Sequence, residues 1–203
     1  MTFVIIVLNA AVFLFQRKLG SGFEDFVRTY GLIPTCAADA FQRHEYLRMA
    51  PPFITSMFLH GGWFHLIGNM WYLWIFGDSV EDKMGRGRFV LFYLLCGLGA
   101  AIGQVSAAPA STVPIIGASG AIAGILGGYF LLFPQSRVLT LIPLFIFITM
   151  VEIPAVLFLG FWFVIQFLNG TVTGADSGGV AWWAHVGGFA TGMFLVFPFR
   201  KYR

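Results

Sequence analysis

The chain has 203 residues and a formal net charge of +3, with 58% apolar and 10% charged residues and a mean hydropathy of +0.82. Soluble globular domains carry about 25% charged residues, so this composition excludes that class and indicates an integral membrane protein. Lipid-exposed backbone must satisfy its own hydrogen bonds, which favours helices, and the sequence lacks the short alternating segments of a β-barrel. We expect the positive charge to reflect membrane topology and expect no nucleic-acid partner.

The first apolar run predicts a membrane helix over about 2–16. A signal peptide is rejected, because the basic segment that precedes the apolar part of a signal peptide is missing here. A long external loop is expected over 17–59. The next charge-free run is interrupted by Pro51-Pro52 and by Gly61-Gly62, which limits the second helix to about 60–78.

A run of 48 residues from Phe89 to Ser136 contains no Asp, Glu, Lys or Arg. As one helix it would reach about 72 Å, against a hydrocarbon core of about 30 Å. The segment 107–114 holds two prolines and predicts a turn. The run therefore predicts a third helix over about 88–106 and a fourth over about 116–133.

The apolar stretch 138–169 carries one charge, Glu152, and is also too long for one crossing. The order Glu152-Ile153-Pro154 is typical of a helix start, because an acid and a proline both favour the first turn. We therefore expect an interfacial element over 138–150 and a fifth helix over about 152–168. The sixth helix is expected over about 180–197.

Six crossings would place both termini on one side of the membrane. Seven of the twelve Lys and Arg residues fall on that side, and the other five share the loop 17–59, where the charge bias counts for less. The sequence thus predicts an all-α, six-helix bundle with both termini in the cytoplasm, folded as a single membrane domain over 1–203.

Ser119 lies among glycines near the start of the fourth helix. A serine becomes a nucleophile only when a base takes its proton, and His185 on the sixth helix is the best candidate for that base. Each residue accompanies a stripe of glycines that would let two membrane helices approach closely. The stripes are Gly120, Gly124 and Gly128 on the fourth helix, and Gly188 and Gly192 on the sixth.

The second helix carries His65 and Asn69 one turn apart, and buried donors of this kind can stabilise a developing oxyanion. His60 is expected before that helix, pointing elsewhere and bonding loop backbone. Taken separately, the glycine stripes and the isolated polar residues also fit ordinary helix packing, as in transporters.

Four motifs, taken together and in their order along the chain, resemble the rhomboid intramembrane serine proteases of bacterial type. They are Gly117 to Gly120, the pattern His60, His65 and Asn69, the segment Ala184 to Gly192, and the segment Glu81 to Phe89. The resemblance covers the second to sixth helices.

The resemblance implies that Ser119 is the nucleophile and that His185 is the general base and then the acid. His65, Asn69 and the Ser119 amide would form the oxyanion hole, Gly117 would shape its loop, and His60, Gly120 and Gly188 would be structural. No cofactor or metal is implied. The substrates would be transmembrane proteins, cleaved near the outer face of the bilayer and often after a small residue, and the location a bacterial plasma membrane.

The chain departs from the family pattern in three respects. Pro51-Pro52 stands where some members have Trp-Arg, and Ala123 stands where some have an aromatic residue that stacks under the histidine. We expect Tyr72 or Trp183 to support the histidine ring instead. No cytoplasmic domain is expected ahead of the first helix.

The segment 169–180 is rich in Gly, Thr and Ser and is predicted to move as a lid, together with the fifth helix. Two other functions stay open. One is an inactive rhomboid-like protein that binds transmembrane clients, and the other is a small transporter with a relay of His65, Asn69 and His185. The oligomeric state is not predicted.

Overall fold

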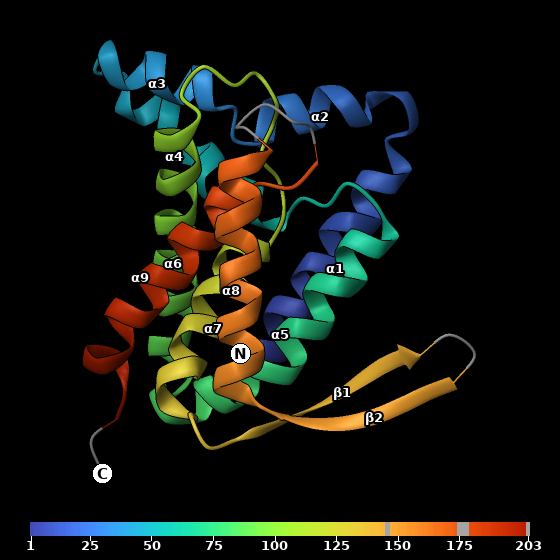
Figure 1. The fold of residues 1–203 in the computed structure, drawn as a ribbon. Coiled ribbons are helices and arrows are strands. Elements are labelled where there is room, and N and C mark those ends of the chain that lie inside the picture. The colour runs from blue at the N-terminus through green and yellow to red at the C-terminus, as the bar shows by residue number, and fades with distance from the viewer. Residues whose placement is uncertain (145–146, 174–178, 202–203) are drawn as a thin grey trace.

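The computed structural model describes residues 1–144, 147–173 and 179–201, and long helices pack side by side in it as a bundle (Figure 1). Each bundle helix overlaps one of the six predicted ranges, so the mostly helical fold is confirmed. The bundle helices are α1 (Thr2–Lys18), α5 (Trp63–Met84), α6 (Arg86–Ala107), α7 (Ser119–Leu132), α8 (Ala155–Val172) and α9 (Trp182–Phe199).

Two helices differ from their predicted bounds in ways that matter for the site. Helix α5 continues past residue 78 to Met84, because charged residues end a membrane segment without ending a helix. Gly85, with φ of 81°, then ends it. Helix α7 starts at Ser119 and not at 116, because Gly117 has a φ of 124° and cannot belong to a right-handed helix.

The segment 17–59, predicted as a long external loop, contains short helices that were not predicted from the sequence. Local charges explain part of it: Glu24 and Asp25 lie in the first turn of α2 and Arg28 in its last, which suits the helix dipole. Helices this short depend on tertiary contacts that sequence periodicity does not reveal. The elements are η1 (Gly20–Gly22), α2 (Phe23–Tyr30), α3 (Pro34–Gln42), α4 (Tyr46–Thr55) and η2 (Ser56–Phe58).

A two-stranded hairpin stands where an interfacial element and the start of the fifth helix were predicted, so the fold is not all-α. Strand β1 (Arg137–Leu144) pairs antiparallel with β2 (Phe147–Pro154), and α8 begins only at Ala155. Pro154 ends the strand in an extended conformation instead of opening a helix, and the carboxylate of Glu152 lies 3.8 Å from the Arg137 guanidinium. In Figure 1 the hairpin lies at the end of the bundle opposite α2 and α3.

The two predicted glycine stripes meet in the structure. An added Cβ at Gly188 would lie 2.0 Å from the carbonyl oxygen of Gly120, and one at Gly192 would lie 1.9 Å from that of Gly124. Helices α7 and α9 therefore touch backbone to backbone, which small residues alone allow. This contact sets the distance between the residues at the start of the two helices.

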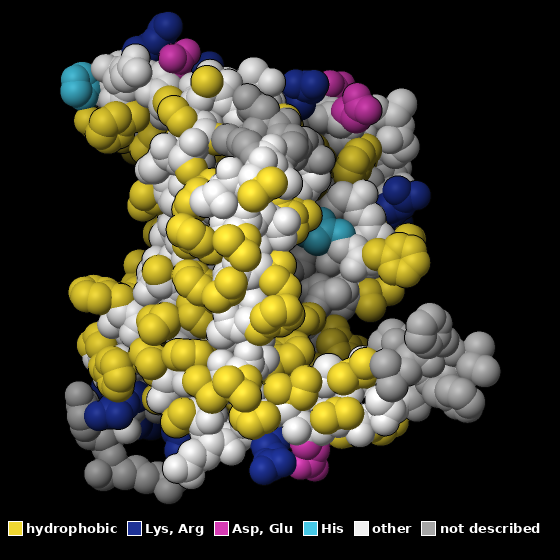
Figure 2. All heavy atoms as spheres, viewed as in Figure 1, with side chains coloured by type: hydrophobic (Ala, Val, Ile, Leu, Met, Phe, Trp, Pro, Cys, Tyr) yellow, Lys and Arg dark blue, Asp and Glu magenta, His cyan; other side chains and the backbone are white. Residues whose placement is uncertain are grey.

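Hydrophobic side chains cover the middle of the face in Figure 2, with charged side chains at both ends. Within the described residues, α6 and α8 are long and apolar enough to cross a membrane, and the bent pair of α1 with η1 and α2 would add a third. Helix α7 is apolar but has only 14 residues. Helices α5 and α9 carry the polar residues His65, Asn69 and His185 within their apolar sequence.

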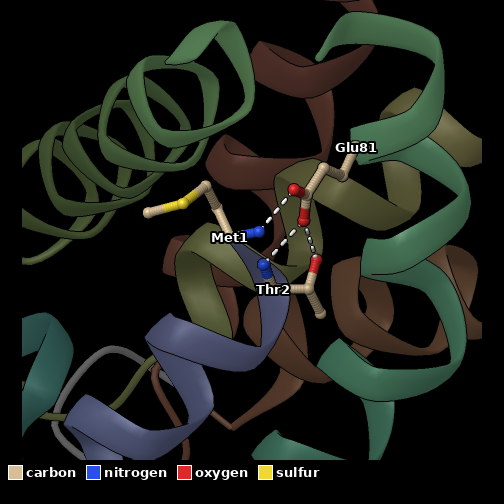
Figure 3. A network of polar contacts seen from close by, with 3 residues as sticks. All are labelled: Met1, Thr2 and Glu81. Carbon is tan, nitrogen blue, oxygen red and sulfur yellow. Dashed lines mark hydrogen bonds and ion pairs between the residues drawn. The ribbon is translucent and has the colours of Figure 1, made fainter. Parts of the chain in front are cut away.

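Both ends of the described chain lie at the hairpin end of the bundle. The Glu81 carboxylate of α5 accepts hydrogen bonds from the Met1 amine and from the backbone N–H and hydroxyl of Thr2, the latter two at 2.7 and 2.9 Å (Figure 3). It thereby satisfies donors at the start of α1 that lack intrahelical partners. Near it, the N–H of Lys201 donates to the Lys83 carbonyl at 2.8 Å.

Candidate active site

Ser119 is the first residue of α7, and the loop before it is fixed on both sides. Leu32 and Ile115 exchange backbone hydrogen bonds of 3.1 and 2.8 Å, and the Gly117 N–H donates to the Ser56 carbonyl at 2.9 Å. The N–H groups in the first turn of α7 have no acceptor within the helix. Ser119 thus stands at a helix N-terminus whose amides can bind a negative charge.

His185 lies in the first turns of α9, and its Nε2 is 2.9 Å from the Oγ of Ser119. The contact joins residues 66 positions apart. It is possible because α7 and α9 touch along the glycine seam, which consists of Gly120 and Gly124 on α7 and Gly188 and Gly192 on α9. Gln104 of α6 fixes the start of α9, because its Oε1 accepts the N–H of Ala184 at 3.1 Å. The imidazole of His185 is thus within hydrogen-bond distance of Ser119, and its role as a base stays a prediction.

The other ring nitrogen of His185 faces a side chain that the sequence did not single out. Nδ1 lies 2.7 Å from the Oε1 of Gln166 on α8. An amide oxygen only accepts, so the matching tautomer carries its proton on Nδ1 and a lone pair on Nε2. That lone pair faces Ser119. An amide, Gln166, within the apolar run of α8 was the signal available in the sequence.

Aromatic rings from α8 and α9 surround the imidazole. The ring of Trp162 lies 5.8 Å from that of His185 at 36°, and the ring of Trp182 lies 6.4 Å away at 89°. The expectation that Tyr72 or Trp183 supports His185 is wrong. Tyr72 packs on Phe76, and Trp183 donates from its indole to the Gly170 carbonyl.

His65 contacts the serine loop, which is the segment that leads into Ser119. An added Cβ at Gly117 would be 2.7 Å from the His65 Nε2 and 3.7 Å from the Ser119 Oγ, so the ring and the loop are in close contact. Gly61 donates its N–H to the Nδ1 of His65 at 3.3 Å, which leaves the proton on Nε2. His65 therefore presents a donor beside Gly117.

Asn69 follows His65 by one turn and is 7% exposed. Its Nδ2 reaches no hydrogen-bond partner among the described residues, which makes it a buried donor without an acceptor. Asn69 does not line the cavity described below.

His60 lies before α5, as predicted, but it does not point elsewhere. Its ring packs against that of His65 with centroids 5.0 Å apart, and it is fully buried. Among the described residues neither ring nitrogen makes a hydrogen bond of ordinary geometry, and the backbone interaction of the ring is with Phe58 in the segment before α5. Gln16 of α1 holds the backbone of His60, accepting its N–H at 3.1 Å.

A cavity of about 620 Å³ opens over Ser119 and His185. Its walls come from the segment 32–57, from α6 and from the loop before Ser119, and they include His65, Gly117 and Gly120. Val180, before α9, also lines it. Of the predicted lid 169–180, the part up to Val172 belongs to α8, and residues 174–178 lie outside the described residues. Ser119 and His185 therefore both border an open cavity.

A family model of the rhomboid domain matches residues 43–202. The chain belongs to the rhomboid family. The resemblance stated from the four motifs is thereby confirmed. A rhomboid chain is a membrane protein, in agreement with the composition and the hydrophobic surface.

Relatives of this rhomboid chain come from bacteria, plants and yeast. The chain is 33% identical over 141 residues to the rhomboid protease GluP of Bacillus subtilis, 36% over 150 residues to RHOMBOID-like protein 4 of Arabidopsis thaliana, and 30% over 158 residues to Rhomboid protein 1, mitochondrial, of Saccharomyces cerevisiae. These alignments cover 70%, 71% and 73% of this chain. They cover 24%, 32% and 42% of the relatives, so the chain spans less than half of their length.

Proposed function

We propose that this rhomboid chain is a serine endopeptidase that hydrolyses peptide bonds in or near transmembrane segments. The observation that carries the proposal is the 2.9 Å contact between the Ser119 Oγ and the His185 Nε2 in a bundle of membrane helices. The relative named rhomboid protease GluP supports it at the level of the family.

The geometry fits a two-step mechanism. The Ser119 Oγ attacks the substrate carbonyl while its proton passes to the His185 Nε2, and the imidazolium then protonates the leaving amine. Water, deprotonated by the same nitrogen, hydrolyses the acyl ester and releases the serine. The mechanism needs no carboxylate as a third catalytic residue, so no charged side chain has to be held at lipid depth.

Two donors lie at the site. The Ser119 N–H belongs to the first turn of α7 and has no acceptor within the helix, and the His65 Nε2 carries a proton beside Gly117. Asn69, one turn from His65, would be a third donor: its Nδ2 has no partner among the described residues, and its side chain would have to turn toward the cavity, which it does not line in this structure. Donors that are in place before the reaction stabilise the developing charge without reorganisation.

We further propose six crossings with both termini in the cytoplasm. The 14 residues of α7 span about 21 Å against a core of about 30 Å, so a helix that ends at the inner face would start below the outer one. Ser119 would then lie within the bilayer near its outer face. The bacterial plasma membrane remains a proposal, because the relatives include proteins named for mitochondria and chloroplasts.

Substrate would enter from the lipid between α8 and the rest of the bundle. The resemblance adds a preference for cleavage after a small residue.

The first test is covalent labelling of the detergent-solubilised protein with a fluorophosphonate probe, read by intact mass. Wild type should gain one adduct, and Ser119→Ala and His185→Ala should gain none. Asn69→Ala should label about 10- to 1,000-fold more slowly, as expected for one of several oxyanion donors. A folded wild type that never labels would favour the function of binding transmembrane clients without cutting them.

A further inference from the structure

The base of the proposed dyad is held by a helix that carries neither dyad residue. Gln166 and Trp162 are four positions apart on α8 and so lie on one face of it, and both contact the His185 ring. The Gln166 Oε1 accepts a hydrogen bond from Nδ1 at 2.7 Å, and the centre of the indole ring lies 5.8 Å from that of the imidazole. Together they restrict both the tautomer and the tilt of the imidazole.

We propose that Gln166 is a positioning residue that keeps the proton of His185 on Nδ1 and its lone pair aimed at Ser119. The inference rests on the proposed protease function and assigns to a neutral amide the place that an aspartate has in a serine triad. The aspartate holds the histidine in the correct tautomer and orientation and also stabilises the imidazolium, and an amide can perform the first of these tasks through its oxygen.

Burial explains why an amide suits this position. Gln166 is 5% exposed on a helix whose other faces are apolar, and a buried polar side chain destabilises the fold unless it is paired. A carboxylate there would also have to be held charged in a medium of low dielectric constant. The amide fixes the tautomer without that cost.

The position on α8 adds a consequence for substrate entry. If α8 moves outward, the Gln166 oxygen leaves Nδ1 and the Trp162 ring leaves the imidazole. The base is then oriented only while α8 is packed against α9. Closure of the helix behind a substrate would therefore restore the reactive arrangement.

The test uses two substitutions of similar length. Gln166→Met removes the acceptor while keeping an unbranched side chain, and Gln166→Glu keeps an acceptor at the same place. We expect Gln166→Met to lower the fluorophosphonate labelling rate about ten- to a hundredfold, as for loss of an orienting hydrogen bond. Gln166→Glu should recover most of the labelling rate because its carboxyl oxygen still accepts the Nδ1–H, but it should unfold at a lower temperature than wild type because the carboxyl group is buried. Asn169→Ala is the matched control, because that amide bonds the carbonyl of Ile165 on its own helix, and it should label at the wild-type rate.

A spectroscopic readout separates this proposal from the protease function. Nitrogen-15 NMR of labelled histidine, assigned by comparison with His185→Ala, should show the Nδ1–H tautomer of His185 in wild type and a mixture of tautomers in Gln166→Met. The spectrum does not depend on turnover, so it stands even if no substrate is cut. An Nε2–H tautomer in wild type would overturn the proposal, and so would wild-type labelling and an unchanged spectrum in Gln166→Met.

Discussion

Helices α7 and α8 both contribute to the site, but they are packed very differently. In α7 every residue from Gly120 to Gly128 is buried, and its glycines contact α6 and α9 directly. In α8 the buried residues are Ala155, Leu159, Gln166 and Gly170, while Phe161 is 70% exposed. The serine is on a helix that cannot shift without breaking the core, whereas the groups that orient its base are on a helix with few neighbours.

This difference separates two tasks within one small bundle. Local stability follows the density of buried contacts, so α8 should open at lower free energy than α7. The seam of α7 and α9 keeps Ser119 and His185 at a fixed distance, and α8 supplies access together with orientation. Substitutions that alter either the contact of α7 with α9 or the packing of α8 therefore test this difference.

The largest effect is expected at the seam. Gly192→Ala places a Cβ 1.9 Å from the Gly124 carbonyl, so the helices must separate. Such overpacking costs of the order of 1–3 kcal/mol or more, and the midpoint of thermal unfolding in detergent should fall by about 5 °C or more, with loss of probe labelling. The matched control is Gly160→Ala on α8, where the nearest atom to an added Cβ is 3.8 Å away. Equal effects at the two glycines would remove the distinction between the helices.

The second prediction concerns a disulfide that would hold α8 against α9. An added Cβ at Gly170 lies 3.4 Å from the Trp182 Cβ, close to the spacing of a disulfide, so the pair Gly170→Cys and Trp182→Cys should bridge α8 to α9. Cys36 is exposed and is replaced by serine in this background. Under oxidation, cleavage of a transmembrane substrate should stop while labelling by the small probe continues.

Reduction of the same sample is the control for this lock, since it leaves both substitutions in place. Cleavage should return when the bridge is reduced. Full cleavage in the oxidised state would contradict entry beside α8.

A smaller effect is expected from the ring that flanks the base. Trp162→Leu should slow labelling about three- to tenfold, because an aromatic contact contributes about 0.5–1.5 kcal/mol. Phe161→Leu changes the neighbouring, largely exposed ring and should leave the rate unchanged. A slower rate in Phe161→Leu than in Trp162→Leu would show that α8 acts through its general packing.

The sequence predicted the six bundle helices better than the short helices α2 to α4 and the hairpin of β1 and β2. Long apolar runs locate helices such as α6 directly, since length and hydropathy decide a membrane span. Helices α2 to α4 are 8 to 10 residues long and are held by contacts with the bundle. In the hairpin 137–154, an apolar run of this length does not distinguish a strand from an interfacial segment by periodicity.

The site shows the same limit at the level of single residues. Ser119 and His185 could be paired because both carry glycine stripes, and the structure brings them to 2.9 Å. Gln166 and Trp162 were not found, since their partner lies on another helix and no local pattern connects them. The close contact of His60 with His65 was missed because it depends on the path of the loop before α5.

The most direct test of the central claim is cleavage in a bilayer. The protein is reconstituted in liposomes with a transmembrane substrate that carries a small residue near its outer end, and the products are identified by mass. Hydrolysis by wild type and none by Ser119→Ala or His185→Ala is the predicted result. An intact substrate that wild type nevertheless binds, or equal cleavage by Ser119→Ala, would contradict the assignment of an intramembrane serine protease.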